Sequence, residues 1–165
     1  MLNSSSPYPC LVTTRPDGWD YEFTTANGAS FAIYFSNETD FFDGTEFANA
    51  VVSVGFKPTA GRRTRRGFRL PTNDDPQLFT TIAWAIETYL VQYPNQIVIW
   101  VCSTLDDQEV ARKSLFDRKY RLWCQRSSLA IVKRDVEITP RDLMSIVYRA
   151  DSRFRTELEA LLPEE

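Results

Sequence analysis

A run of seven residues, Gln96–Cys102, constrains the fold of this chain more than any other feature. Almost every position in the run is apolar, although successive side chains of an extended strand point to opposite faces of a sheet. Such a strand is buried on both faces, which is typical of the interior of a sheet that helices cover. Because a helix is predicted on either side of the run, we expect an interior strand with a parallel neighbour.

The two flanking helices have clear boundary signals. Asp75 is a suitable N-cap, Pro76 fits the first helical position, and apolar residues then recur every three to four positions until Pro94. After the apolar run, Thr104 and Asp107 have the spacing of a helix-capping motif. That motif predicts a second helix, which extends to about Cys124.

The rest of the chain is dominated by strand patterns. Asn27-Gly28 is a turn signal between two alternating segments, which predicts a hairpin. The predicted elements are strands Trp19–Phe23, Phe31–Phe35 and Val51–Phe56, the last ended by Pro58, a hairpin of Leu129–Ile138 with Leu143–Tyr148, and a final helix from Asp151 or Ser152 to Leu162. The order β-β-β-α-β-α-β-β-α predicts an α+β fold, with a mixed, mainly antiparallel sheet and helices packed on it.

Length and composition favour one domain. The chain has 165 residues, of which 43% are hydrophobic and 13% aromatic, which is enough for one packed core. We expect residues 17–162 to form a single α+β domain, and residues 1–16 to form a partly flexible N-terminal tail. The first residues lack the pattern of a signal peptide, and the three widely spaced cysteines do not suggest a disulfide framework. We therefore expect a cytoplasmic protein.

The chain contains no histidine. This absence excludes Ser-His-Asp and Cys-His catalytic pairs and histidine-based zinc sites. The sequence also lacks a glycine-rich phosphate loop and a metal-ligand motif. We therefore expect no cofactor, no metal site and no catalytic residues.

A strongly basic segment is the first candidate site. The segment from Lys57 to Arg69 contains six basic and no acidic residues. Because the net charge of the whole chain is −3, the remainder of the chain has a net charge of −9. The candidate residues for binding an anion or a partner are Arg62, Arg63, Arg65, Arg66 and Arg69. Guanidinium groups bind phosphates in forked geometry, but an exposed loop also uses charge for solvation or for contact with an acidic protein. Nucleic acid is not favoured, because the chain as a whole is acidic.

The predicted second helix carries the other candidate residues, which would line a crevice at the carboxyl end of the buried strand. They are Thr104, Asp106, Asp107, Arg112, Asp117 and Arg118. Asp107 and Asp117 are separated by roughly 15 Å of helix, so they cannot bind one metal ion. The alternative interpretation is local: acidic residues at the helix start complement its dipole, and the charges farther along form pairs.

The order of elements resembles the core of GNAT-type acyltransferases, in which three antiparallel strands precede a helix, a parallel strand, a second helix and two closing strands. The resemblance implies a pyrophosphate site at the first core helix, but Thr64 and Arg69 do not fit that family's Gln/Arg-x-x-Gly-x-Gly/Ala motif around Gly67. Ala111 and Leu115-Phe116 resemble a pattern of the second helix. Phe116 occupies the position of the family's general-acid tyrosine, and a phenyl ring donates no proton.

Two further motifs resemble an uncharacterised bacterial family of small single-domain proteins of unknown function. They are Tyr21-x-Phe23-Thr24-Thr25-x-x-Gly28 and a longer pattern from Cys102 through Asp106-Asp107 and Arg112 to Phe116-Asp117-Arg118. This resemblance implies no activity.

The sequence thus leads to a functional hypothesis with an alternative. The leading hypothesis is a non-catalytic cytoplasmic binding domain that contacts a protein partner or a phosphate-bearing ligand and no membrane. The alternative is a divergent acyl-CoA-dependent transferase. A metal-dependent hydrolase ranks last, because the sequence offers no paired carboxylates for it.

Overall fold

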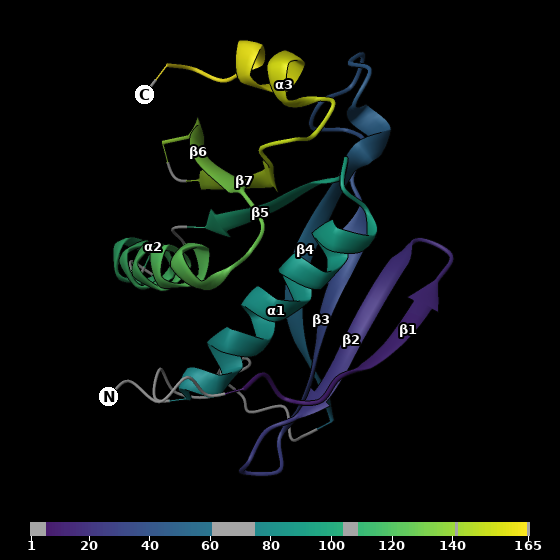
Figure 1. Cartoon of the computed structure of the whole chain (residues 1–165), viewed down its shortest axis with the longest axis vertical. Helices are drawn as coiled ribbons and strands as arrows, with labels where there is room; N and C mark the ends of the chain where they lie inside the picture. Colours follow the sequence, from purple (N-terminus) through teal and green to yellow (C-terminus); the bar gives the residue numbers. More distant parts are fainter. Residues whose placement is uncertain (1–5, 61–74, 104–108, 141, 165) are drawn as a thin grey trace.

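Seven strands form one mixed sheet in a computed structural model, which describes residues 6–60, 75–103, 109–140 and 142–164 (Figure 1). The strands are β1 (Leu11–Arg15), β2 (Gly18–Thr24), β3 (Ser30–Asn37), β4 (Val51–Ala60), β5 (Ile97–Ser103), β6 (Ile131–Thr139) and β7 (Asp142–Arg149). Their spatial order is β1-β2-β3-β4-β5-β7-β6. The helices are α1 (Pro76–Gln92), α2 (Glu109–Arg126) and α3 (Arg155–Leu161), with a short 3₁₀ helix η1 (Ala48–Ala50).

The sheet confirms the predicted α+β class. Only β4 and β5 run parallel, and each of the other neighbouring pairs is antiparallel. β5 lies between β4 and β7, so the apolar run is an interior strand with one parallel neighbour, as predicted. α1 is the crossover that connects the parallel pair.

Two details of the predicted order are wrong. Leu11–Arg15, within the segment predicted as a tail, forms an additional strand, so that four strands precede α1. Its side chains are largely exposed, and it therefore lacks the alternation that reveals a half-buried strand. β4 also continues through Pro58 to Ala60. Proline is tolerated there because β5 no longer pairs with this part of β4, so no backbone donor is needed on that side.

One face of the sheet packs on α1 and α2. Alternate residues of the strands point to this face, and the largest buried ones are aromatic. Phe35 of β3 and Tyr89 of α1 are both inaccessible to solvent, and their rings stack with centroids 4.3 Å apart. Such a pair contributes about 1 kcal/mol beyond the apolar area that it buries. On the same side, the Trp123 indole of α2 donates a hydrogen bond to Glu87 of α1 at 2.8 Å.

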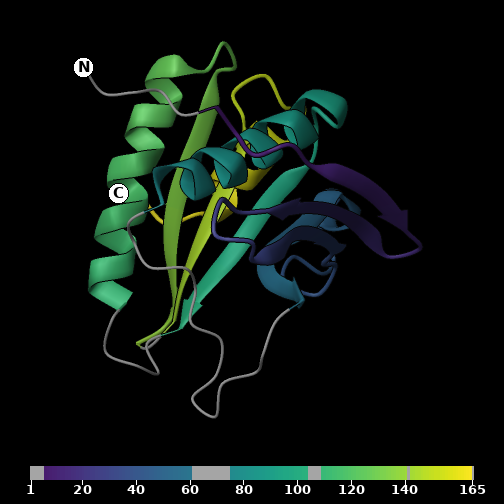
Figure 2. The same ribbon diagram turned by 90° about the horizontal axis from the view of Figure 1, so that it is seen from below.

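On the opposite face, the described elements cover one end of the sheet. There η1 and α3 pack on β5 and β7, through Phe47, Phe154 and Leu158 against Ile97 and Ile146. Over β1–β4 the same face carries polar side chains. Arg15 forms an ion pair with Asp20 at 3.1 Å, and the Lys57 ammonium lies 5.2 Å from the centroid of the Tyr34 ring. Among the described residues, α1 and α2 thus cover one face of the sheet, and η1 and α3 cover one end of the other (Figure 2).

Candidate functional site

The parallel strands β4 and β5 are neighbours along only part of their length. Their described register joins Val51–Ser53 to Ile97–Ile99 and extends no farther, so the strands separate towards their carboxyl ends (Figure 1). The arginine-rich segment follows β4, and the capping motif Thr104–Asp107 follows β5. Both predicted sites therefore begin at the carboxyl ends of the single parallel pair, where open sheets commonly bind ligands.

The side chains predicted for these two sites lie mostly outside the described residues. This holds for Arg62, Arg63, Arg65, Arg66, Arg69, Thr104, Asp106 and Asp107. Arg112 belongs to α2, but its side chain is outside the described part of that helix. The structure does place Asp117 and Arg118, and it describes the sheet at both ends of the arginine-rich segment.

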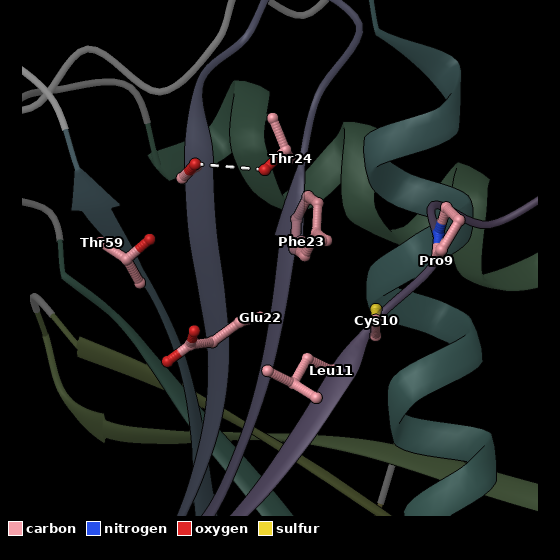
Figure 3. A pocket seen from close by; sticks show the side chains of 8 residues that line it. Pro9, Cys10, Leu11, Glu22, Phe23, Thr24 and Thr59 are labelled. Atoms are coloured by element: carbon pink, nitrogen blue, oxygen red, sulfur yellow. Dashed lines mark hydrogen bonds between the residues drawn. The ribbon is translucent and has the colours of Figure 1, made fainter.

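A cavity of about 580 Å³ lies at the end of the sheet where the β2–β3 turn is located (Figure 3). Its lining comes from β1–β4 and the residues before β1: Pro9, Cys10, Leu11, Glu22, Phe23, Thr24, Ser30 and Thr59. Polar and apolar groups are mixed in this lining, with one carboxylate, three hydroxyls and the exposed Leu11 side chain. The Thr24 and Ser30 hydroxyls share a hydrogen bond at 3.2 Å.

The described residues on either side of the arginine-rich segment are held by strand pairing and by helix capping. At its start, Ala60 pairs with Ser30, and the preceding Thr59 lines the cavity. At its end, Asp75 caps α1 by accepting from the backbone of Gln77 and Leu78 at 3.0 and 3.1 Å, as predicted.

The Tyr8 hydroxyl connects this cap to the β2–β3 turn. It donates to Asp75 at 2.9 Å and accepts from the backbone N–H of Ala26 at 3.2 Å. Tyr8 is itself buried, and its own backbone N–H donates to the Thr81 hydroxyl at 2.8 Å. On one side of the five arginines, the described chain thus ends next to the cavity-lining Thr59, and on the other side it resumes at Asp75, which Tyr8 connects to the β2–β3 turn.

The cavity has no nucleophile that is active at neutral pH. Burial raises the pKa of the Cys10 thiol to about 11, and the thiol donates to the Tyr8 carbonyl oxygen at 3.4 Å. A protonated thiol is a poor nucleophile and a poor metal ligand. Across the described residues, no group of three or more acidic or cysteine side chains is placed to hold a metal ion.

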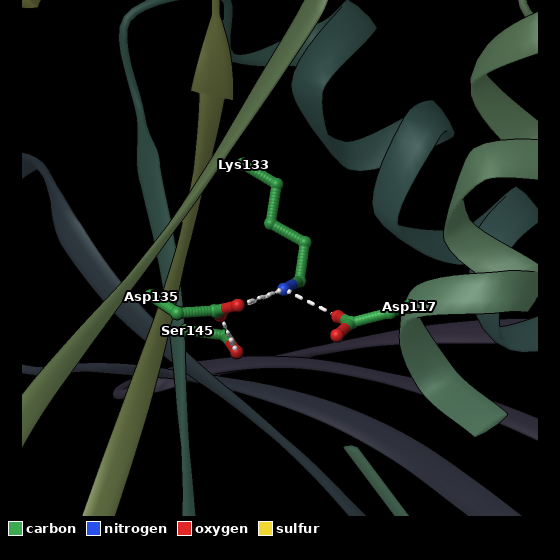
Figure 4. A network of polar contacts seen from close by, with 4 residues as sticks. All are labelled: Asp117, Lys133, Asp135 and Ser145. Atoms are coloured by element: carbon green, nitrogen blue, oxygen red, sulfur yellow. Dashed lines mark hydrogen bonds and ion pairs between the residues drawn. The ribbon is translucent and has the colours of Figure 1, made fainter. Parts of the chain in front are cut away.

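A second polar cluster lies between α2 and the sheet (Figure 4). Lys133 of β6 is 8% exposed, and its ammonium group lies 2.9 Å from Asp117 of α2 and 2.7 Å from Asp135 of β6. Ser145 of β7 donates to the same Asp135 carboxylate at 2.6 Å. The Tyr120 ring contacts the ammonium from 5.8 Å. Burial raises the pKa of Tyr120 well above its usual value, which keeps the ring neutral.

This cluster accounts for Asp117 structurally. The Lys133 ammonium donates to one oxygen of Asp117 and to both oxygens of Asp135, which uses its three protons. Lys133 and Asp135 were not predicted as a site, although their spacing of two places them on the same face of β6. Arg118, the next residue along α2, points to solvent. Of the helix candidates, the described structure thus places Asp117, which anchors α2, and Arg118, which is exposed.

Comparisons with known proteins add no assignment. No family model, curated protein or solved structure matches this chain. None of the helices in the described ranges has the length and hydropathy to cross a bilayer.

Proposed function

We propose that this chain is a binding domain for a phosphate-bearing small ligand, which it holds at the cavity beside the β2–β3 turn. One observation carries the proposal: the arginine-rich segment comes shortly after Thr59, which lines that cavity, and before Asp75, which the Tyr8 hydroxyl connects to the β2–β3 turn. The sequence of this segment carries five arginines, and guanidinium groups bind phosphates in forked geometry.

The cavity itself favours a small ligand over a protein partner. Its volume of about 580 Å³ lies in the range of small-molecule sites, whereas a protein surface needs no such recess. Glu22 would repel an isolated anion and accepts from N–H or O–H donors, whereas the hydroxyls of Thr24, Ser30 and Thr59 can donate or accept. The expected ligand therefore has two parts, a phosphate for the arginines and a part rich in N–H or O–H groups for the cavity.

An acyl-CoA-dependent transferase is the second candidate. The observed arrangement supports it, because apart from the additional strand β1 its element order agrees with the order that resembles the GNAT core, with one parallel pair, β4 and β5, among the described strands. Phe116 and the broken glycine motif weigh against the chemical step. Since CoA bears phosphates, one set of ligands tests both candidates.

The first prediction is that a phosphate-bearing ligand stabilises the protein. In a thermal unfolding assay, we compare inorganic phosphate, ATP, acetyl-CoA and polyglutamate, the last as a model of an acidic protein. A ligand at 100 times its Kd adds roughly 2.7 kcal/mol, which raises the Tm of a chain of this size by roughly 5–10 °C. The stabilisation should weaken as salt is added, because exposed charges are screened.

Matched variants assign the effect to the segment. Replacing all five arginines, or only Arg65 and Arg66, with glutamine should abolish or reduce the shift while the Tm without ligand changes little. As a control, glutamine replaces the exposed residues Arg121 and Arg126 of α2. This variant loses as much charge as the variant of Arg65 and Arg66, but at another place on the protein. Stabilisation by polyglutamate alone, or a shift that survives the five-residue change, contradicts the proposal. A shift by acetyl-CoA accompanied by acyl transfer to an amine supports the second candidate.

A further inference from the structure

One wall of the cavity comes from the chain just before β1. Pro9 and Cys10 line the cavity there, and Thr59 of β4 lies on its other side (Figure 3). The pairing of β1 with β2 begins at Leu11, which is opposite Glu22. Pro9 and Cys10 therefore precede the ladder of the sheet, and the position of this wall depends on what holds the residue before it.

Tyr8 holds the wall through its backbone, its ring and its hydroxyl. The backbone N–H donates to the Thr81 hydroxyl of α1 at 2.8 Å, and the ring stacks on Phe23 of β2 with centroids 5.7 Å apart. The hydroxyl donates to Asp75 at 2.9 Å and accepts from the Ala26 N–H at 3.2 Å. Tyr8 is only 7% exposed, and a hydrogen bond to a carboxylate is stronger than one between neutral groups.

The Asp75 carboxylate connects the wall to the start of α1. Its Oδ1 atom accepts the two capping hydrogen bonds from Gln77 and Leu78, whereas its Oδ2 atom accepts from the Tyr8 hydroxyl. Because both oxygens belong to one planar group, the Tyr8 hydroxyl helps to fix the orientation in which Asp75 caps the helix. The wall, the helix cap and the β2–β3 turn thus meet at one hydroxyl.

We propose that Tyr8 is a positioning residue for the cavity: its hydroxyl holds the wall of Pro9 and Cys10 in place, so that the cavity is formed before a ligand enters. When this hydroxyl is lost, the wall opens locally while the rest of the fold stays intact. A ligand that binds only the closed cavity shifts the wall back to the closed state. This last step rests on the proposed function, whereas the role of Tyr8 in the wall does not.

The Cys10 thiol reports the state of the wall. It lines the cavity and donates to the Tyr8 carbonyl oxygen at 3.4 Å. Since a protonated, half-buried thiol reacts slowly, its rate of alkylation by N-ethylmaleimide measures how often the wall opens. Cys124 of α2 is also half-buried and serves as the reference within each sample. Peptide mass spectrometry gives the alkylation rate of each cysteine separately.

The test compares two tyrosines whose hydroxyls each donate to a carboxylate. Tyr8→Phe removes the hydroxyl at the wall and keeps the buried ring, whereas the control Tyr148→Phe removes a hydroxyl that donates to Glu159 of α3 at 2.8 Å. We expect Tyr8→Phe to raise the alkylation rate of Cys10, relative to Cys124, at least about tenfold, and Tyr148→Phe to leave this ratio unchanged. An unchanged ratio in Tyr8→Phe, or an equal rise in both variants, overturns the proposal.

Added ligand separates this role from the proposed function. The probe is ATP or acetyl-CoA, whichever gives the larger Tm shift, at 100 times its Kd. It should slow the alkylation of Cys10 in Tyr8→Phe at least about tenfold, because it stabilises the closed wall. A probe that raises the Tm without slowing this reaction overturns the positioning role. If neither probe raises the Tm of the wild type while Tyr8→Phe still exposes Cys10, the proposed function fails and the role of Tyr8 in the wall is supported.

Discussion

Replacing Lys133 with methionine is expected to lower the free energy of unfolding by about 3 kcal/mol. The substitution keeps most of the buried apolar stem but removes the ammonium group between Asp117 and Asp135. Two carboxylates then face each other beneath α2 without the Lys133 ammonium between them. The side chains of Asp117 and Asp135 are 29% and 23% exposed. Because water still reaches these carboxylates, we expect a loss of stability at the lower end of the range that is usual for breaking a buried ion pair. Urea unfolding followed by circular dichroism measures it.

Two companion variants separate charge from packing. A triple variant, Lys133→Met with Asp117→Asn and Asp135→Asn, removes the whole network and should regain most of the lost stability. Arg149→Met breaks the pair with Asp151 at 2.7 Å, in which the aspartate is 66% exposed, and should cost less than about 1 kcal/mol. If the triple variant is as unstable as the single one, Lys133 stabilises the fold through its packing against Tyr120 rather than through its charge.

The strongest sequence patterns located the elements that shape the sheet. The two-faced apolar run predicted the interior position of β5, and Asp75-Pro76 predicted the start of α1 with its capping hydrogen bonds. The Asn27-Gly28 turn has Gly28 at a φ of +83°, as the hairpin prediction requires. In each case, the residue types that the local structure requires are also those that the tertiary position requires. The local sequence pattern therefore predicted these elements correctly.

β1 and the continuation of β4 were missed for one physical reason. An edge strand and a strand segment without a second neighbour need neither alternation nor a full set of backbone donors. Leu11–Arg15 therefore lacks a strand pattern, and Pro58 looked like a strand end. Nothing local in such segments distinguishes them from loop, because their stability comes from pairing with distant residues.

The candidate sites depended even more on long-range placement. No local signal links Glu22, Ser30 and Thr59, which line one cavity only because β2, β3 and β4 are adjacent. Lys133 and Asp135 share a face of β6, but the contact with Asp117 requires the packing of α2 on that face. The sequence identified residues with chemical potential, whereas the topology determines which of them meet.

The second large effect is expected at Gly18, the first residue of β2, where alanine should cost about 3 kcal/mol. A Cβ atom at this position would lie 1.8 Å from the carbonyl oxygen of Phe35, on the adjacent strand β3. The obstacle is backbone rather than a side chain that can rotate, so β2 and β3 must move apart to admit a methyl group. That movement would disturb Phe35, whose ring stacks on Tyr89 in the core.

Gly28 provides the matched control for this prediction. A Cβ atom there meets nothing within 4 Å, but the φ of +83° is unfavourable for any residue with a side chain. Gly28→Ala should therefore cost only about 1 kcal/mol, and Gly28→Asn less, because asparagine tolerates the left-handed region. Chemical denaturation of the three variants should give the order Gly18→Ala, Gly28→Ala, Gly28→Asn from least to most stable. If Gly18→Ala is as stable as Gly28→Asn, then the close approach of β2 to the Phe35 carbonyl does not limit this position, and the tight register of the β1–β2–β3 edge is wrong.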